Sequence, residues 1–373
     1  MSAPIAESRF MPSLFDPLDL SPALALPNRI LMAPLTRGRA TREGVPTDLQ
    51  RDYYAQRAGA GLIISEATGI SREGLGWPYA PGLWTDDQVE GWKPVVAAVH
   101  EAGGRIVAQL WHMGRLVHDN VSGMRSISAS ATKPPYPAHT YAGKLELPEA
   151  AAASLDDIQR ILGDYAGAAR NAIAAGFDGV QIHGANGYLI DQFLRDGTNL
   201  RTDDYGGSVD NRLRFMTGVV EAVAAEVGID RTGIRLSPVG ESQGCDDSDN
   251  PGLFTAVAAR LEALGMPWIE LREPGRNSTF RATDEPPASP AMRAVYSGKL
   301  VLNSDYDGTN AQATLDAGIA DAISFGRTFI ANPDLPERLR VGARLNEWDS
   351  KTFYSQGPEG YTDYPFVAEQ AVA

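Results

Sequence analysis

The chain has 373 residues, of which 43% are hydrophobic and 21% charged, a composition typical of a folded globular protein. Its 33 Lys and Arg against 47 Asp and Glu give a net charge of −14, which argues against nucleic acid or an anionic membrane as a partner. The single cysteine, Cys245, excludes a disulfide within the chain, an iron–sulfur cluster and a cysteine zinc site. Glu7 and Arg9 stand where a signal peptide would have its apolar run, and no apolar stretch is long enough to span a membrane. We therefore expect a cytoplasmic protein.

Short apolar runs alternate with longer segments of helical spacing along the whole chain. Eight runs are typical of strands buried on both faces: residues 29–34, 61–67, 105–111, 179–184, 233–238, 268–273, 299–304 and 321–327. Helices are expected at 86–101, 155–175 and 210–227, with N-caps Asp86, Ser154 and Asp210 and with ends at Gly103, Gly176 and Gly265. This alternation predicts an α/β fold, a closed (β/α)8 TIM barrel forming a single domain over residues 1–373.

Four segments exceed what a minimal barrel needs. Residues 1–10 are expected to be a flexible extension, and Leu24 and Leu26 to belong to an N-terminal hairpin that closes the barrel bottom. Residues 112–150, between the third strand and its helix, are too long for a plain loop and predict a capping insertion over the barrel mouth. The aromatic C-terminal tail from Leu345 onward is expected to fold over the same end.

The strand ends carry no lysine, and the five histidines are scattered, so neither a Schiff-base enzyme nor a catalytic metal site is indicated. A bound organic cofactor would supply the missing chemistry. The densest polar cluster follows the fourth strand, where His183 and Asn186 would share a face if the loop turns helically, with Tyr188 beside them. Two donors and a phenol suit carbonyl activation with proton delivery. The alternative is that His183 caps a loop and Tyr188 packs its ring.

The last two strands of a barrel commonly form a phosphate site. Here they end in Ser304 and Asp305 and in Gly326 and Arg327. Gly326 would let the backbone approach a phosphate and Arg327 would supply charge. A surface salt bridge is the alternative for Arg327.

Several motifs together resemble the old yellow enzymes, flavin-dependent ene-reductases on a (β/α)8 barrel. The resemblance spans about residues 11–366 and is closest to the bacterial 2-cyclohexenone reductase or N-ethylmaleimide reductase type. The motifs that carry it are Ala33–Arg37 (APLTR), Ile64–Thr68 (ISEAT), Ala108–His112 (AQLWH), His183–Tyr188 (HGANGY), Asn199–Ser208 (NLRTDDYGGS) and Phe325–Arg327 (FGR).

The resemblance implies a non-covalent FMN over the barrel mouth. Its expected neighbours are Pro34, Leu35 and Thr36 along the ring, Ala67 close to it, Gln109 and Arg235 at its pyrimidine edge, and Ser304, Asp305, Gly326 and Arg327 at the phosphate. Many relatives carry glycine or alanine at positions 304 and 305, so we expect backbone N–H groups to serve there, with the Asp305 side chain pointing away. Trp77 and Tyr354 are expected to wall the substrate pocket.

The implied reaction is a ping-pong reduction of activated C=C bonds in α,β-unsaturated carbonyl, maleimide or nitro compounds. NADPH or NADH would give a hydride to the flavin, which passes it to a substrate held by His183 and Asn186, and Tyr188 would protonate the α-carbon. A flavin-binding carrier or sensor barrel and a flavin-free sugar phosphate isomerase are the rival interpretations. Monomer and homodimer are both compatible with the sequence.

Overall fold

The computed structural model describes residues 11–279 and 281–370, so the predicted extension at residues 1–10 lies outside the described residues. Eight parallel strands form the barrel: β3 (Ile30–Met32), β4 (Leu62–Ile64), β6 (Ile106–Trp111), β11 (Gly179–His183), β12 (Thr232–Leu236), β13 (Trp268–Arg272), β14 (Lys299–Asn303) and β15 (Ala322–Phe325). The ring closes because β11 pairs with both β6 and β12, and a short strand β5 (Thr68–Gly69) joins beside β6. The predicted (β/α)8 barrel is confirmed.

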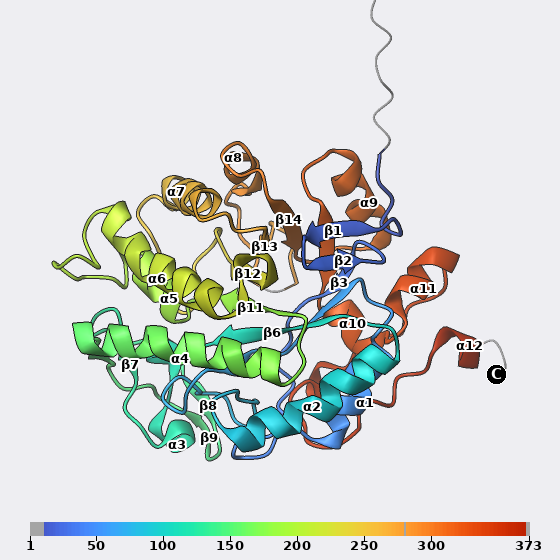
Figure 1. Ribbon diagram of the computed structural model, residues 1–373, viewed down its shortest axis with the longest axis horizontal. Helices are drawn as coiled ribbons and strands as arrows, with labels where there is room; N and C mark the ends of the chain where they lie inside the picture. Colours follow the sequence, from blue (N-terminus) through green and yellow to red (C-terminus); the bar gives the residue numbers. More distant parts are fainter. Residues whose placement is uncertain (1–10, 280, 371–373) are drawn as a thin grey trace, which may run out of the picture.

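Helices surround the strands (Figure 1). The larger ones are α1 (Asp48–Gln56), α2 (Asp86–Glu101), α4 (Leu155–Ala174), α6 (Val209–Val227), α7 (Asn250–Ala263) and α9 (Gly308–Asp316). Shorter ones are α5 (Leu189–Leu194), α8 (Ser289–Arg293), α10 (Arg327–Ala331), α11 (Leu335–Val341), α12 (Val367–Gln370) and the 3-10 turns η2 (Ile229–Arg231) and η3 (Ser350–Thr352). No helix within the described residues is long and apolar enough to cross a membrane.

Two of the three predicted N-caps are wrong by one or two residues. The caps are Thr85 and Ser208, whose hydroxyls accept the N–H groups of Gln88 and Asn211, while Asp86 and Asp210 lie in the first turn. There the carboxylates face the positive end of the helix dipole, so an acidic first turn and an acidic cap look alike in sequence. Ser154 caps α4 as predicted, accepting from the N–H of Asp157.

The N-terminal hairpin plugs the bottom of the barrel. Strands β1 (Leu18–Ser21) and β2 (Leu24–Leu26) pair antiparallel. Their four buried leucines join one apolar cluster with inward-facing residues of the barrel strands: Leu31, Leu62, Ile64, Val107, Trp268, Val301 and Ala322. A Cβ at Gly233 would lie 2.0 Å from the Trp268 ring, so a glycine is required there for the indole to fill the barrel centre.

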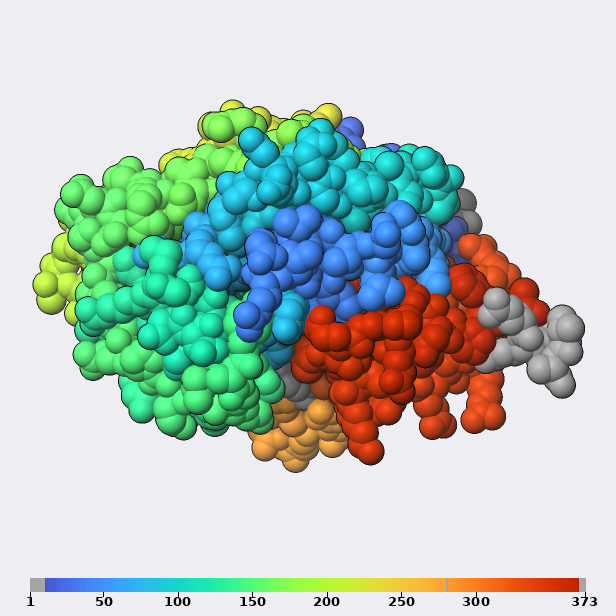
Figure 2. Space-filling model, turned by 90° about the horizontal axis from the view of Figure 1, so that it is seen from below, coloured from blue at the N-terminus to red at the C-terminus, as the bar shows by residue number. Residues whose placement is uncertain are grey.

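The opposite end carries the predicted capping insertion and the aromatic tail. The insertion contains η1 (Gly114–Leu116), α3 (Asp119–Ser122), β7 (Ile127–Ser128) and the hairpin of β8 (Ala138–Thr140) and β9 (Gly143–Leu145), and β10 (Ala151–Ala152) follows and pairs with β7. From below, residues 112–150 and the tail lie on opposite sides of one face (Figure 2).

The tail is held to the barrel by Arg37, whose guanidinium donates to the carbonyls of Phe353 and Gly360. Tyr361 stacks on Tyr53 with ring centroids 4.0 Å apart.

Replacing Leu20 in the hairpin by alanine should lower the free energy of unfolding by about 2–5 kcal/mol, because Leu20 is 1% exposed and the plug cannot collapse into the cavity. The matched control is Leu155→Ala, at a position 55% exposed, which should change it by less than about 0.5 kcal/mol. Urea unfolding followed by tryptophan fluorescence measures both. Equal losses in the two variants would contradict the role of the hairpin as a plug.

Candidate active site

A pocket of about 900 Å³ opens at the carboxyl ends of the barrel strands. It is lined by strand ends, the insertion and the tail. Twelve of the predicted site residues line it: Pro34, Leu35, Thr36, Trp77, Asn186, Tyr188, Arg235, Ser304, Asp305, Gly326, Arg327 and Tyr354. The other three, Ala67, Gln109 and His183, are buried at 4%, 1% and 4% exposure. The fold thus brings twelve predicted residues, from the ends of five strands and from two distant loops, to one pocket, whereas Ala67, Gln109 and His183 are not part of its lining.

His183 is the last residue of β11, and its ring is neutral. Its Nδ1 accepts the N–H of Ala185 at 3.3 Å, so in the neutral ring the proton resides on Nε2. Burial, together with the nearby charge of Arg235, places the pKa of His183 well below its ordinary value. His183 therefore offers a neutral N–H donor and at the same time caps its own loop.

Tyr188 precedes α5 and presents a protonated phenol. Its ring meets the rings of His183 and Trp111 edge-on, with centroids 4.9 and 5.0 Å apart. Burial raises the pKa of Tyr188 to about 12, so the hydroxyl keeps its proton at neutral pH. The Tyr188 ring is packed against its neighbours, and the residue also lines the pocket, so a role in packing does not exclude a role in proton delivery.

Asn186 does not lie on a right-handed helical turn, contrary to the simplest expectation. Its φ is 60° and that of Gly187 is 77°, so the loop reverses through two left-handed residues. The backbone N–H of Asn186 donates to the Ser237 hydroxyl at 2.7 Å. Its Oδ1 is buried without a hydrogen-bond partner among the described residues, which indicates space for a polar ligand.

A layer of polar side chains crosses the barrel beneath the pocket. Strand register pairs Gln109 with Gln181 and Arg235 with Glu270. Arg235 donates to Glu270 at 2.8 Å and to Asn303 at 2.8 Å, and the fully buried Glu270 also accepts from Ser324 at 2.6 Å. The layer is therefore a connected network rather than a set of isolated polar groups.

The charge of Glu270 fixes the direction of the amides that follow it. A carboxylate only accepts hydrogen bonds, so Gln181 must point its NH2 group at Glu270, at 2.8 Å. Its carbonyl oxygen then accepts from the Gln109 NH2 group at 2.8 Å. Gln109 is left with a carbonyl acceptor and a second N–H, which suits a ligand edge that both donates and accepts.

At the predicted phosphate corner, Thr279 holds the Asp305 side chain. The Asp305 carboxylate accepts the N–H and hydroxyl of Thr279 at 2.9 and 2.6 Å. Although burial raises it, these hydrogen bonds bring the pKa of Asp305 below its ordinary value. Ser304 and Asp305 have φ of 152° and 30°, which glycine adopts more easily. Arg327 lies with its guanidinium 5.4 Å from the Trp348 ring centroid.

Four arginines line the pocket, namely Arg235, Arg272, Arg281 and Arg327. Burial, followed by the charges of the other three, lowers the pKa of Arg272 to about 9. Like charges gathered in a partly buried site are costly unless an anion binds among them. The pocket is therefore electropositive in an acidic protein and suited to a phosphate-bearing ligand.

Sequence reasoning missed five residues of this site: Gln181, Glu270, Arg272, Arg281 and Asn303. A signal existed for Gln181 and Glu270, each a polar residue between apolar neighbours in a fully buried strand. Arg272 is the last residue of β13, and Arg235 is the last but one of β12, so both are arginines near the carboxyl end of a buried strand. Arg281 lies in a loop and had no such signal.

A (β/α)8 barrel with an electropositive, hydrogen-bonding pocket at the strand carboxyl ends defines a class of enzymes that hold a phosphorylated cofactor. Residues 13–346 match the family described as NADH:flavin oxidoreductase / NADH oxidase, so the chain belongs to this family of FMN-dependent oxidoreductases, the old yellow enzymes.

Individual relatives agree along nearly their whole length. The old yellow enzyme homologue of Zymomonas mobilis is 57% identical, with a TM-score of 0.94 over 95% of this chain and 100% of that one. Morphinone reductase in complex with tetrahydroNAD is 47% identical, with a TM-score of 0.89 over 95% and 98%. The 12-oxophytodienoate reductase 7 of Oryza sativa subsp. japonica is 41% identical over 379 residues, 95% of each chain.

The pocket fits FMN on the evidence of its own atoms. The Nε of Arg235 is buried and unpartnered within the described part of the chain, and Gln109 uses one N–H of its amide toward Gln181. The arginine cluster provides for a phosphate, and the Asp305 carboxylate at its edge is occupied by Thr279, whose hydroxyl also accepts from Arg327. In residues 11–279 and 281–370, no group of three or more His, Cys, Asp or Glu side chains is placed to hold a metal ion.

Replacing Glu270 by glutamine should lower the free energy of unfolding by about 3–5 kcal/mol, because Arg235 is left buried without its counter-charge. The control is Ser324→Ala, which removes one donor to the same carboxylate and should cost only about 0.5–1.5 kcal/mol. Chemical denaturation of the two variants in parallel measures the difference. A loss in Glu270→Gln no larger than in Ser324→Ala would show that the ion pair is not what holds the layer together.

Proposed function

We propose that this protein is an NAD(P)H-dependent ene-reductase that reduces the activated C=C bond of α,β-unsaturated carbonyl, maleimide or nitro compounds. One observation carries the proposal. Asn186 and the protonated phenol of Tyr188 line the pocket, and the neutral ring of His183 meets the Tyr188 ring edge-on at 4.9 Å between centroids. This set combines oxyanion stabilisation with a proton donor.

We assign the cofactor contacts on the same basis. Pro34, Leu35 and Thr36, with Ala67 behind them, would face the FMN ring, and Gln109 and Arg235 its pyrimidine edge. Backbone N–H groups at Ser304 and Gly326, together with Arg327, would hold its phosphate, with Asp305 turned toward Thr279. When bound, FMN supplies the hydride chemistry that these side chains cannot perform.

The residues of the chain then have distinct roles toward the substrate. His183 and Asn186 donate to the carbonyl or nitro oxygen, which withdraws electrons from the β-carbon and stabilises the charge that develops on the oxygen. The Tyr188 hydroxyl delivers a proton to the α-carbon. The net reaction adds one hydride and one proton across the double bond and oxidises NAD(P)H to NAD(P)⁺.

An aromatic wall is suited to exclude water from this chemistry. Trp77 packs against Tyr354 of the tail and His139 of the insertion, with ring centroids 5.1 and 4.9 Å apart. Flat, conjugated substrates would bind against such surfaces. A nicotinamide donor is supported by morphinone reductase, which binds tetrahydroNAD, and both NADPH and NADH are retained in the proposal.

Anaerobic stopped-flow absorbance of the flavin tests the proposal. In the wild type, NADPH or NADH should bleach the flavin band and 2-cyclohexenone should restore it. Tyr188→Phe should slow the recovery by about 10²- to 10⁴-fold and leave the bleaching unchanged, because only the second half-reaction needs the phenol proton. Bleaching without recovery in the wild type would contradict the ene-reductase assignment, and equal slowing of both phases in the variant would contradict the role of Tyr188.

The pH dependence of recovery should reflect the raised pKa of Tyr188. An acid with a pKa of about 12 keeps its proton as pH rises, so the rate should decline only at pH values above the ordinary tyrosine pKa of about 10. Single-turnover rates of the wild type should therefore stay nearly constant between about pH 7 and 10, and those of Tyr188→Phe should be slow throughout this range. A decline in the wild type centred below about 10 would show that another group limits the reaction.

A further inference from the structure

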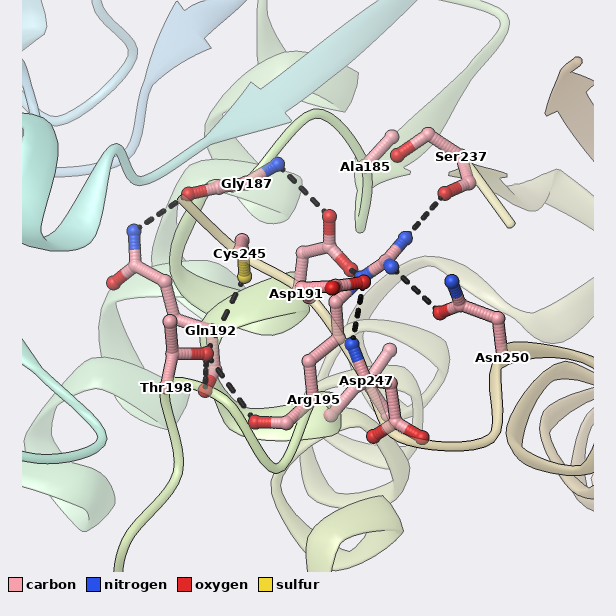
Figure 3. A network of polar contacts seen from close by, with 12 residues as sticks. Ala185, Gly187, Asp191, Gln192, Arg195, Thr198, Ser237, Cys245, Asp247 and Asn250 are labelled. Carbon is pink, nitrogen blue, oxygen red and sulfur yellow. Dashed lines mark hydrogen bonds and ion pairs between the residues drawn. The ribbon is translucent and has the colours of Figure 1, made fainter. Parts of the chain in front are cut away.

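A fully buried ion pair lies beneath the loop of residues 183–188. Arg195 Nε donates to Asp191 Oδ1 at 2.8 Å, and both side chains have 0% exposure. Figure 3 shows the pair between this loop and the segment 237–250. Buried ion pairs add little net stability compared with apolar residues, so a structural role alone is a weak explanation.

Each member of the pair controls one backbone amide of the loop. Asp191 Oδ2 accepts the N–H of Gly187 at 2.8 Å. Arg195 donates to the Ser237 carbonyl at 2.6 Å, and the hydroxyl of the same serine accepts the N–H of Asn186 at 2.7 Å. The two amides between His183 and Tyr188 are therefore fixed from below by one ion pair.

The loop needs this support because its backbone is unfavourable. Asn186 and Gly187 are consecutive left-handed residues, and a Cβ at position 187 would lie 2.3 Å from the Ser242 carbonyl oxygen. Without the two hydrogen bonds the loop could relax, and the Asn186 amide and the Tyr188 ring, on either side of Gly187, would both move.

The pair also ties the loop to the segment that follows the adjacent strand β12. The second guanidinium nitrogen of Arg195 donates to Asn250 at 2.7 Å, at the end of the segment that contributes Gly240, Glu241 and Gln243 to the pocket lining. Arg195 thus donates to both ends of the segment 237–250.

We propose that Asp191 and Arg195 are positioning residues for alkene reduction, which hold Asn186 and Tyr188 in register with the substrate oxygen and α-carbon. This inference rests on the proposed function. Neither side chain lines the pocket as the structure describes it, so both act through the loop. A misplacement of about 1 Å in a catalytic group can reduce a rate by about 100-fold.

The chain offers a closely matched control pair. Asp334 and Arg338 have the same spacing, with Arg338 Nε donating to Asp334 Oδ1 at 2.6 Å, and Asp334 Oδ2 likewise accepts a backbone N–H, that of Val367. Asp334→Asn therefore removes the same charge from the same kind of contact without touching the 183–188 loop.

The experiment compares Asp191→Asn with Asp334→Asn as flavin-loaded proteins. Hydrogen–deuterium exchange should show faster exchange at Asn186 and Gly187 in Asp191→Asn only, because asparagine has one acceptor oxygen for two donors. Recovery of the flavin band with 2-cyclohexenone should slow by about 10- to 100-fold in Asp191→Asn and by less than about twofold in Asp334→Asn, even where both melt at a lower temperature. Arg195→Lys, which keeps the charge but not the planar fork, should give a smaller change of the same kind and serves if Asp191→Asn does not fold.

The outcomes separate the two proposals. The positioning role would be overturned if Asn186 and Gly187 exchanged at the wild-type rate in both Asp191→Asn and Arg195→Lys. It would also be overturned if Asp191→Asn and Asp334→Asn slowed the recovery equally. If the wild type itself does not reduce 2-cyclohexenone, the proposed function is wrong. The positioning role in that reaction is then wrong too, even if the exchange rates of Asp191→Asn and Asp334→Asn differ.

Discussion

The Arg235–Glu270 ion pair is the interaction on which the order of the site depends. It joins β12 to β13 at the centre of the barrel, where a carboxylate with no exposure would be costly without a partner. Ser324 and Gln181 occupy the remaining acceptor positions of Glu270, and Asn303 receives the second arm of Arg235. Because the carboxylate cannot donate, the orientation of each amide in the layer follows from it. The floor of the pocket is therefore preorganised before any ligand arrives.

The electrostatics of the pocket oppose those of the whole chain. A net charge of −14 repels anionic ligands at a distance, yet four arginines converge on one concave site. Salt screens the distant charges within about 10 Å, whereas a partly enclosed cluster is screened much less. An anion thus gains binding energy mainly after it has entered the pocket. This arrangement favours recognition of a specific phosphate group over general attraction of polyanions.

The sequence was sufficient for the barrel because strands and helices follow from local patterns. All eight strands, the hairpin at Leu24 and Leu26, and the helix stops at Gly103, Gly176 and Gly265 lie where periodicity and glycine placed them. The site depended on register, which local patterns do not contain. Glu270 is conspicuous as a polar residue in a buried strand, but its partner could not be predicted because Arg235 is 35 positions away and adjacent only through strand pairing.

The conformation of the loop after β11 likewise could not be predicted from local sequence. The spacing of His183 and Asn186 suggested a helical turn, which would have been the least strained way to bring them together. The backbone instead uses left-handed Asn186 and Gly187, because Asp191 and Ser237 bind their N–H groups from below. Residues in such conformations cost about 1–3 kcal/mol each unless the surroundings over-determine them. Those surroundings include Arg195 and Asn250, far along the chain.

His183 and Tyr188, two of the side chains that would contact a substrate, are both uncharged. Burial and Arg235 keep His183 neutral, and burial keeps Tyr188 protonated although the charge of Arg281 acts in the opposite direction. A protonated imidazole would add a fifth positive charge to a site that already contains four arginines. The four arginines therefore make the electrostatic potential of the pocket positive, whereas the neutral His183 and Tyr188 would donate hydrogen bonds to a substrate. Burial thus sets the protonation states of both side chains, and these are the states that the proposed reaction would need.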